Sequence, residues 1–205
     1  MDRLPPAGVW AVASALPAEE AASWMQSAAP AAAWTFRMPV GGELQAAQCL
    51  RALQQQAPWL AVHGQSDLAF AAKADAVIAG ARSLPWDELA GQAQNEGLRF
   101  GASVHDADEL ERAQGLGADF VVVGPVFATP SKQGILEPLG LEGLRPFLQA
   151  QVRVVAIGGI ESPEQVATLA EEGVHAVAAL RAARDPGRFA ELCAAWPTSA
   201  GGSRG

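Results

Sequence analysis

Eight short apolar runs alternate with eight helix-forming segments along almost the whole chain, and this alternation restricts the possible folds more than any other feature. The runs are rich in alanine and valine, as expected of parallel strands that are buried on both faces. A strand that is followed each time by a helix predicts parallel strands joined by right-handed crossovers. The apolar runs cover residues 9–14, 34–38, 59–63, 76–79, 99–104, 120–123, 152–157 and 176–180. The predicted helices cover residues 17–29, 43–56, 66–73, 85–95, 106–116, 141–150, 163–172 and 186–195.

Eight such units in 205 residues fit a single-domain α/β fold, a (β/α)8 TIM barrel, that spans residues 1–196. An open, doubly wound parallel sheet is the alternative. Its dinucleotide-binding pattern, G-x-G-x-x-G, is missing after the first run, which continues into Ala15-Leu16-Pro17. Residues 197–205 are small and polar, and we expect them to form a disordered tail.

Composition excludes several classes of protein. Half of the residues are hydrophobic and 18% are charged, so the chain can form a sizeable core. The net charge of −8 and the lack of a basic stripe argue against nucleic acid as a partner. No apolar run reaches the roughly 18 residues of a membrane span, and the N-terminus lacks the pattern of a secretory signal. With Cys49 and Cys193 interpreted as free thiols, the sequence predicts a cytoplasmic protein without a membrane partner, and a homo-oligomer stays open.

Polar residues gather at the carboxyl ends of the predicted strands, where barrels of this kind bind their ligands. These residues are Ser14, Arg37, His63, Ser103, His105, Thr129, Ser131, Lys132 and Arg181. In addition, Gly158 and Gly159 form a turn between the seventh strand and the helix that follows it. Bare backbone N–H groups and the helix dipole favour an anion at such a turn, so the sequence predicts a phosphate site there.

Four side chains at these ends are candidates for chemistry or binding. His63 ends the third strand and could transfer a proton near pH 7, although it could equally be a satisfied polar residue of a pocket wall. His105 lies two residues after Ser103, on the same side of an extended segment, but it could instead hold the loop before the next helix. Arg37 needs an anion or a charged partner at a strand end. Lys132, beside hydroxyl groups, suits a phosphate.

Three motifs in the second half of the chain resemble the thiamine phosphate synthase / TenI family. The most specific is G-A-D-F-V-V-V-G-P-V-F-A-T-P-S-K at 117–132, and the others are V-V-A-I-G-G-I at 154–160 and G-A-S-V-H at 101–105. The resemblance implies a (β/α)8 barrel of thiamine biosynthesis. Synthases of this family are transferases that join a pyrimidine diphosphate to a thiazole phosphate and release pyrophosphate.

The resemblance also implies roles for individual residues. Thr129, Ser131 and Lys132 would contact phosphate groups, Gly158 and Gly159 would donate N–H groups to the thiazole phosphate, Ser103 would face the pyrimidine, and Arg37 matches an arginine on the second strand of the synthases.

The chain departs from the synthase pattern at the metal ligands. The synthases hold Mg²⁺ with aspartates after the third and fourth strands, where this chain has His63-Gly64 and Gly80-Ala81-Arg82-Ser83. TenI proteins also lack these aspartates, and some of them tautomerise a thiazole carboxylate phosphate with a histidine that corresponds to Pro125 here. Arg181 stands where the family usually has a serine.

We therefore expect a protein that binds a thiazole phosphate or thiamine phosphate without a metal or other cofactor. If it is an enzyme, we expect metal-free proton transfer by His63 or His105. Two alternatives stay open: an active synthase, which would require Mg²⁺, and a non-catalytic regulatory protein that binds thiamine phosphates.

Overall fold

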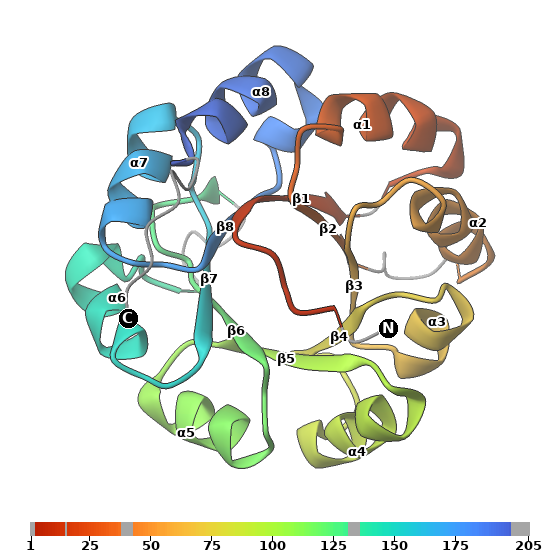
Figure 1. Ribbon diagram of the computed structural model, residues 1–205, viewed down its shortest axis with the longest axis horizontal. Coiled ribbons are helices and arrows are strands. Elements are labelled where there is room, and N and C mark those ends of the chain that lie inside the picture. Colours follow the sequence, from red (N-terminus) through yellow and green to blue (C-terminus); the bar gives the residue numbers. More distant parts are fainter. Residues whose placement is uncertain (1–2, 15, 38–42, 131–135, 198–205) are drawn as a thin grey trace.

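The strands close into a barrel in chain order, and every neighbouring pair is parallel (Figure 1). The computed structural model describes residues 3–197 except 15, 38–42 and 131–135, so the expected tail lies almost wholly outside the described residues. The strands are β1 (Gly8–Ser14), β2 (Ala33–Arg37), β3 (Leu60–His63), β4 (Ala76–Ala79), β5 (Arg99–Val104), β6 (Phe120–Val123), β7 (Arg153–Ile157) and β8 (Ala176–Ala179). Because β1 pairs with β8, the (β/α)8 barrel is confirmed and the open sheet is excluded.

One helix follows each strand and lies on the outside of the barrel (Figure 1). The helices are α1 (Ala21–Ala28), α2 (Glu43–Gln54), α3 (Ser66–Ala71), α4 (Trp86–Glu96), α5 (Ala107–Gly115), α6 (Gly140–Leu148), α7 (Pro163–Glu171) and α8 (Pro186–Ala195). The first predicted helix was too long, because it begins as a separate 3₁₀ turn, Ala18–Glu20, in which the Glu20 N–H donates to the Pro17 carbonyl at 3.1 Å. No helix in the described ranges is long and apolar enough to cross a membrane.

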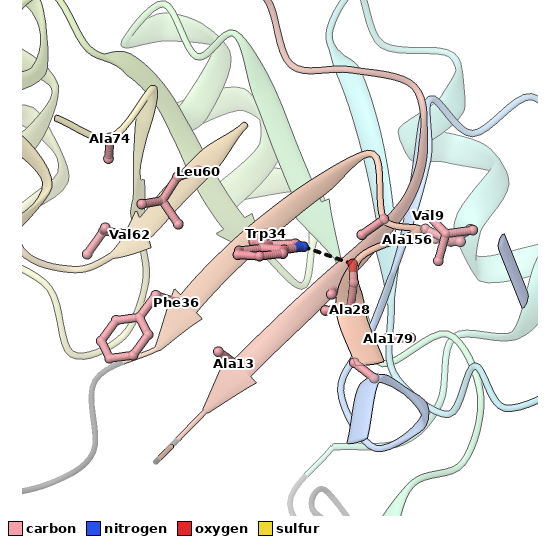
Figure 2. Close-up of a cluster of buried hydrophobic side chains, with 14 of the residues drawn as sticks. Val9, Ala13, Ala28, Trp34, Phe36, Leu60, Val62, Ala74, Ala156 and Ala179 are labelled. Carbon is pink, nitrogen blue, oxygen red and sulfur yellow. Dashed lines mark hydrogen bonds between the residues drawn. The ribbon is translucent and has the colours of Figure 1, made fainter. Parts of the chain in front are cut away.

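The layer between strands and helices forms the larger part of the core. Side chains such as Trp34, Phe36 and Val62 point outward from the sheet, toward the helices (Figure 2). The indole N–H of Trp34 donates to the Ala28 carbonyl at 3.0 Å, which satisfies the one polar atom of this side chain. Burial of these large side chains holds the helices against the barrel.

Aromatic rings fill the amino-terminal half of the barrel interior. Trp10, Trp59 and Phe120 are fully buried, and their ring centroids lie 5.2 to 5.9 Å apart. The N-terminal segment covers this end, since the indole of Trp10 donates to the Pro6 carbonyl at 2.9 Å. Smaller side chains follow toward the carboxyl ends of the strands. The interior is thus solid at one end and leaves space at the other.

Gly101 on β5 makes room for this aromatic cluster. A Cβ at this position would lie 2.4 Å from the Phe120 ring. We expect Gly101→Ala to lower the free energy of unfolding by about 1–3 kcal/mol, because the ring must leave its packed position. Urea unfolding measures the change. Gly91→Ala is the control, since a Cβ there meets nothing within 4 Å, and alanine should stabilise the α4 interior by about 0.5–1 kcal/mol. Equal effects of the two substitutions would contradict the packing argument.

Candidate functional site

A cavity of about 800 Å³ opens at the carboxyl ends of the strands, above the aromatic cluster. Its floor consists of apolar side chains that point into the barrel, among them Val12, Ile78, Val122 and Ile157. Inward-pointing positions alternate along each strand. Arg37 and His63 are the inward positions that follow Thr35 and Ala61, so the rim is polar where the floor is apolar.

The cavity brings most of the predicted site residues together. Those that line it are Arg37, His63, Ser103, His105, Thr129, Gly158, Gly159 and Arg181. Ser131 and Lys132 lie outside the described residues. Residues from six of the eight strand ends or the loops that follow them thus meet at one mouth, as the topology of the barrel requires.

The Gly158–Gly159 turn contributes a bare backbone donor. Both glycines have positive φ angles, 99° and 68°, which favour glycine. Side chains would not fit, because a Cβ would lie 2.6 Å from Pro125 Cα at Gly158 and 2.6 Å from the Phe127 carbonyl oxygen at Gly159. Within the described part of the chain, the Gly159 N–H donates no hydrogen bond. The turn therefore combines close packing against the loop after β6 with a free donor at the cavity.

Two arginines face each other across the β2–β4 side of the cavity. Burial, and to a smaller extent the charge of Arg82, lowers the pKa of Arg37. Neither arginine has an ion pair with a carboxylate among the described residues. Two cations that repel each other and lack a counter-ion favour an anionic ligand between them.

His63 lies beside Arg37 in the parallel register of β2 and β3. Burial, with a smaller contribution from the Arg37 charge, lowers the pKa of His63 to about 3. The imidazole is therefore neutral at pH 7. In the ligand-free protein it can donate or accept a hydrogen bond, but it holds no extra proton that it could transfer.

This low pKa makes stability depend on pH. The unfolded chain takes up a proton at His63 below about pH 6.5, whereas the native protein does so only near pH 3. The free energy of unfolding should therefore fall as the pH drops through this window. Between pH 6.5 and 4.5 we expect the wild-type protein to lose about 2 kcal/mol more than His63→Gln, as measured by urea unfolding at each pH. Parallel losses in the two proteins would contradict the shifted pKa.

His105 has a carboxylate partner. Its Nδ1 lies 3.0 Å from Oε2 of Glu109, and the same oxygen accepts the backbone N–H of His105 at 2.7 Å. Asp106 caps α5 by accepting the Glu109 N–H at 2.8 Å. Glu109 does not return a bond to its cap residue but orients His105 instead. With Nδ1–H directed at the carboxylate, Nε2 is left as a proton acceptor.

Arg181 is not a free cation at the mouth. Its Nε and Nη2 both lie 2.7 Å from Oε1 of Glu161, and Arg188 contacts the other oxygen of that carboxylate at 2.9 Å. Glu161 follows the Gly-Gly turn by two residues and lines the cavity.

The cavity residues do not fit a magnesium site. Mg²⁺ prefers carboxylate oxygens in octahedral geometry. The described lining contains a single carboxylate, that of Glu161, which is already paired with two arginines. At the ends of β3 and β4 the lining contributes His63 and Arg82 instead. No group of three or more potential metal ligands occurs among the residues with described positions.

Three residues that shape the site were not predicted from the sequence. Arg82, Glu109 and Glu161 were not among the candidates. Two of them could have been recognised by their place in the sequence, because Arg82 follows a predicted strand and Glu161 lies two residues after the Gly-Gly turn. Glu109 follows His105 by four residues, and only the structure shows that its carboxylate contacts the imidazole.

Comparison with known proteins assigns the family. The profile of the thiamine monophosphate synthase family (TMP-TENI) matches residues 43–183, which include all the predicted site residues except Ser14 and Arg37. A thiamine-phosphate synthase from Gloeobacter violaceus is 41% identical over 130 residues, which are 62% of this chain and 38% of that protein. A thiamine-phosphate synthase from Latilactobacillus sakei is 36% identical over 140 residues, which are 66% of this chain and 62% of that protein.

A solved structure agrees with this assignment over nearly the whole chain. The thiamine phosphate pyrophosphorylase from Pyrococcus furiosus superimposes with a TM-score of 0.75 and 25% identity, over 92% of this chain and 94% of that one. The curated relatives are longer than the regions they share with this chain, which covers between 33% and 62% of the length of these proteins. The profile match covers more than half of the sequence, and the chain therefore belongs to the thiamine monophosphate synthase (TMP-TENI) family.

Proposed function

We propose that this chain binds a thiazole phosphate or thiamine phosphate in the barrel mouth and does so without Mg²⁺-dependent synthase chemistry. The observation that carries the proposal is the charge of the cavity. Its lining contains three arginines, Arg37, Arg82 and Arg181, and a single carboxylate that is already paired, although the whole chain has a net charge of −8. Such a local excess of positive charge favours an anionic ligand.

The phosphate fits the β7–β8 side of the cavity. The bare N–H of Gly159 and the hydroxyl of Thr129 line this part. Ser131 and Lys132 follow Thr129 closely in the sequence, and we propose that they add a hydroxyl and a positive charge to the phosphate site. Backbone donors bind a phosphate without any side-chain entropy cost, which makes the turn the first contact.

A second acidic group of the ligand fits the opposite side. Arg37 and Arg82 lie at the ends of β2 and β4, across the barrel from β7 and β8. Guanidinium groups bind carboxylate and phosphate oxygens in pairs. The two arginines would supply positive charge without a divalent ion. Ser103 lies between the two sides and would contact the heterocycle.

Proton transfer is the chemistry that these groups favour. Nε2 of His105 can accept a proton from one position of the heterocycle and return it at another, while Glu109 stabilises the imidazolium that forms in between. His63 would remain neutral and donate or accept a hydrogen bond. A tautomerisation involves no net oxidation or reduction, so it needs no redox cofactor.

A magnesium-dependent synthase is the second candidate, because the relatives at 36% and 41% identity are named thiamine-phosphate synthase. It would require that substrate phosphates bind the metal with little help from this chain. A regulatory protein that binds thiamine phosphates without turnover is the third outcome.

A thermal-shift screen distinguishes these functions. We expect thiazole phosphate or thiamine phosphate, at about 100 times its dissociation constant, to add roughly 2.7 kcal/mol of stability in EDTA as well as in Mg²⁺. Stabilisation only in Mg²⁺, together with pyrophosphate release from the two synthase precursors, would establish the synthase. No stabilisation by either phosphate would refute the proposed ligand class.

A further inference from the structure

Glu161 is the one acidic side chain in the described lining of the cavity. Its carboxylate pairs with two arginines, Arg181 and Arg188. Arg181 follows β8 and lines the cavity, whereas Arg188 belongs to α8 and is not part of the lining. The carboxylate is three-quarters buried, with a relative exposure of 24%. Each arginine binds its own oxygen, at 2.7 Å for Arg181 and 2.9 Å for Arg188.

Arg188 holds Glu161 more completely than Arg181 does. Its Nε also donates to the backbone carbonyl of Glu161 at 3.2 Å, so it grips both the side chain and the main chain. On the other side, the Glu161 N–H donates to Oε1 of Gln165 at 2.7 Å. Glu161 therefore stays in place if Arg181 leaves it, and its charge stays paired.

Arg181 has no such second anchor. Glu161 is the only partner of its guanidinium among the described residues, and half of its side chain is exposed. An ion pair whose arginine is half exposed contributes little to stability. A phosphoryl group with nearly two negative charges and three acceptor oxygens is a stronger partner for a guanidinium than one carboxylate oxygen.

We infer that Glu161 is an internal counter-anion of Arg181. When a phosphoryl dianion binds, it replaces Glu161 as the partner of Arg181, and Glu161 stays paired with Arg188. This inference rests on the proposed phosphate site beside Gly159. Arg181 and Glu161 then make the mouth selective, because a neutral or singly charged group gains too little from Arg181 to break the pair. The exchange leaves no carboxylate unpaired, which keeps its cost low.

The test is a double-mutant cycle in which isothermal titration calorimetry measures the dissociation constant of thiamine phosphate for each variant. Glu161→Gln removes the competing charge and keeps the shape of the side chain, and we expect it to tighten binding about three- to tenfold. Arg181→Gln should weaken binding about tenfold. In the Arg181→Gln background, Glu161→Gln should change the dissociation constant less than twofold, because the pair no longer exists.

The cycle separates exchange from a general electrostatic effect. If Glu161 only repelled the phosphate, Glu161→Gln would tighten binding equally with and without Arg181, and the inference would be wrong. Unchanged affinity in Glu161→Gln would overturn it as well. Glu172→Gln is the matched control, since Glu172 pairs with Arg145 outside the cavity, and it should leave affinity unchanged.

Two further outcomes have a defined meaning. If the wild-type protein does not bind thiamine phosphate or thiazole phosphate, the proposed function fails and the inference fails with it. If the wild-type protein binds and the cycle shows no coupling, the proposed function stands and only the exchange is refuted. Thermal unfolding of each variant checks that it is folded.

Discussion

Replacing Gly159 with alanine is expected to lower the free energy of unfolding by about 3–4 kcal/mol and to abolish phosphate binding. Two effects add up. Alanine at a φ of 68° is strained by about 1–2 kcal/mol. In addition, its Cβ would lie 2.6 Å from the carbonyl oxygens of Phe127 and Ala128, which are backbone atoms and cannot rotate away. The turn or the loop after β6 must move, and the Gly159 N–H moves with it.

Gly97 provides a matched control for this substitution. It has almost the same φ, 67°, but a Cβ there meets nothing within 4 Å. Gly97→Ala should therefore cost only the backbone strain, about 1 kcal/mol, and leave ligand affinity unchanged. Urea unfolding and calorimetric titration of both variants measure the difference. If Gly159→Ala were no worse than Gly97→Ala, the close packing of the turn would not matter.

Replacing His105 with alanine is expected to reduce proton transfer about 100-fold and to change ligand affinity less than threefold. A positioned general base contributes on this scale, and the imidazole contacts Glu109 but no described cationic group of the phosphate site. The rate of tautomerisation of thiazole carboxylate phosphate is measured in deuterium oxide from the incorporation of deuterium. Ligand affinity is determined separately by calorimetry.

Two variants distinguish catalysis from a structural role of His105. Glu109→Gln keeps the imidazole but loses the carboxylate that stabilises its charged form, so turnover should fall by an intermediate factor, about tenfold. His63→Ala should reduce turnover less than His105→Ala, since the pKa of His63 is about 3. A larger loss in His63→Ala would reverse these roles, and no turnover in the wild-type protein would favour a binding protein.

Much of the architecture could be predicted because it is encoded locally. Alternating apolar runs and helical segments predict the closed barrel, and only element ends were displaced by a few residues, as for the 3₁₀ turn at Ala18–Glu20. The cap at Asp106 follows from a short sequence pattern as well. Strand ends could be named as the site because a parallel barrel brings every such end to one face.

The pairing of charges could not be predicted in the same way. Arg37 and Arg82 are far apart in sequence, as are Glu161 and Arg181, and no periodicity specifies which side chains meet. The low pKa of His63 depends on burial and on a neighbouring cation, which belong to the assembled mouth. Arg181 was a candidate for the ligand site whose role the sequence left open, and the structure pairs it with a carboxylate that sequence reasoning left out.

Local sequence patterns specify the barrel, the Gly-Gly turn and the set of polar residues at the barrel mouth, because backbone preference and strand period act over a few residues. Which of those residues are charged, paired or available to a ligand follows only from the folded arrangement. These properties depend on distances of a few ångströms between segments that are far apart along the chain, and only packing sets such distances.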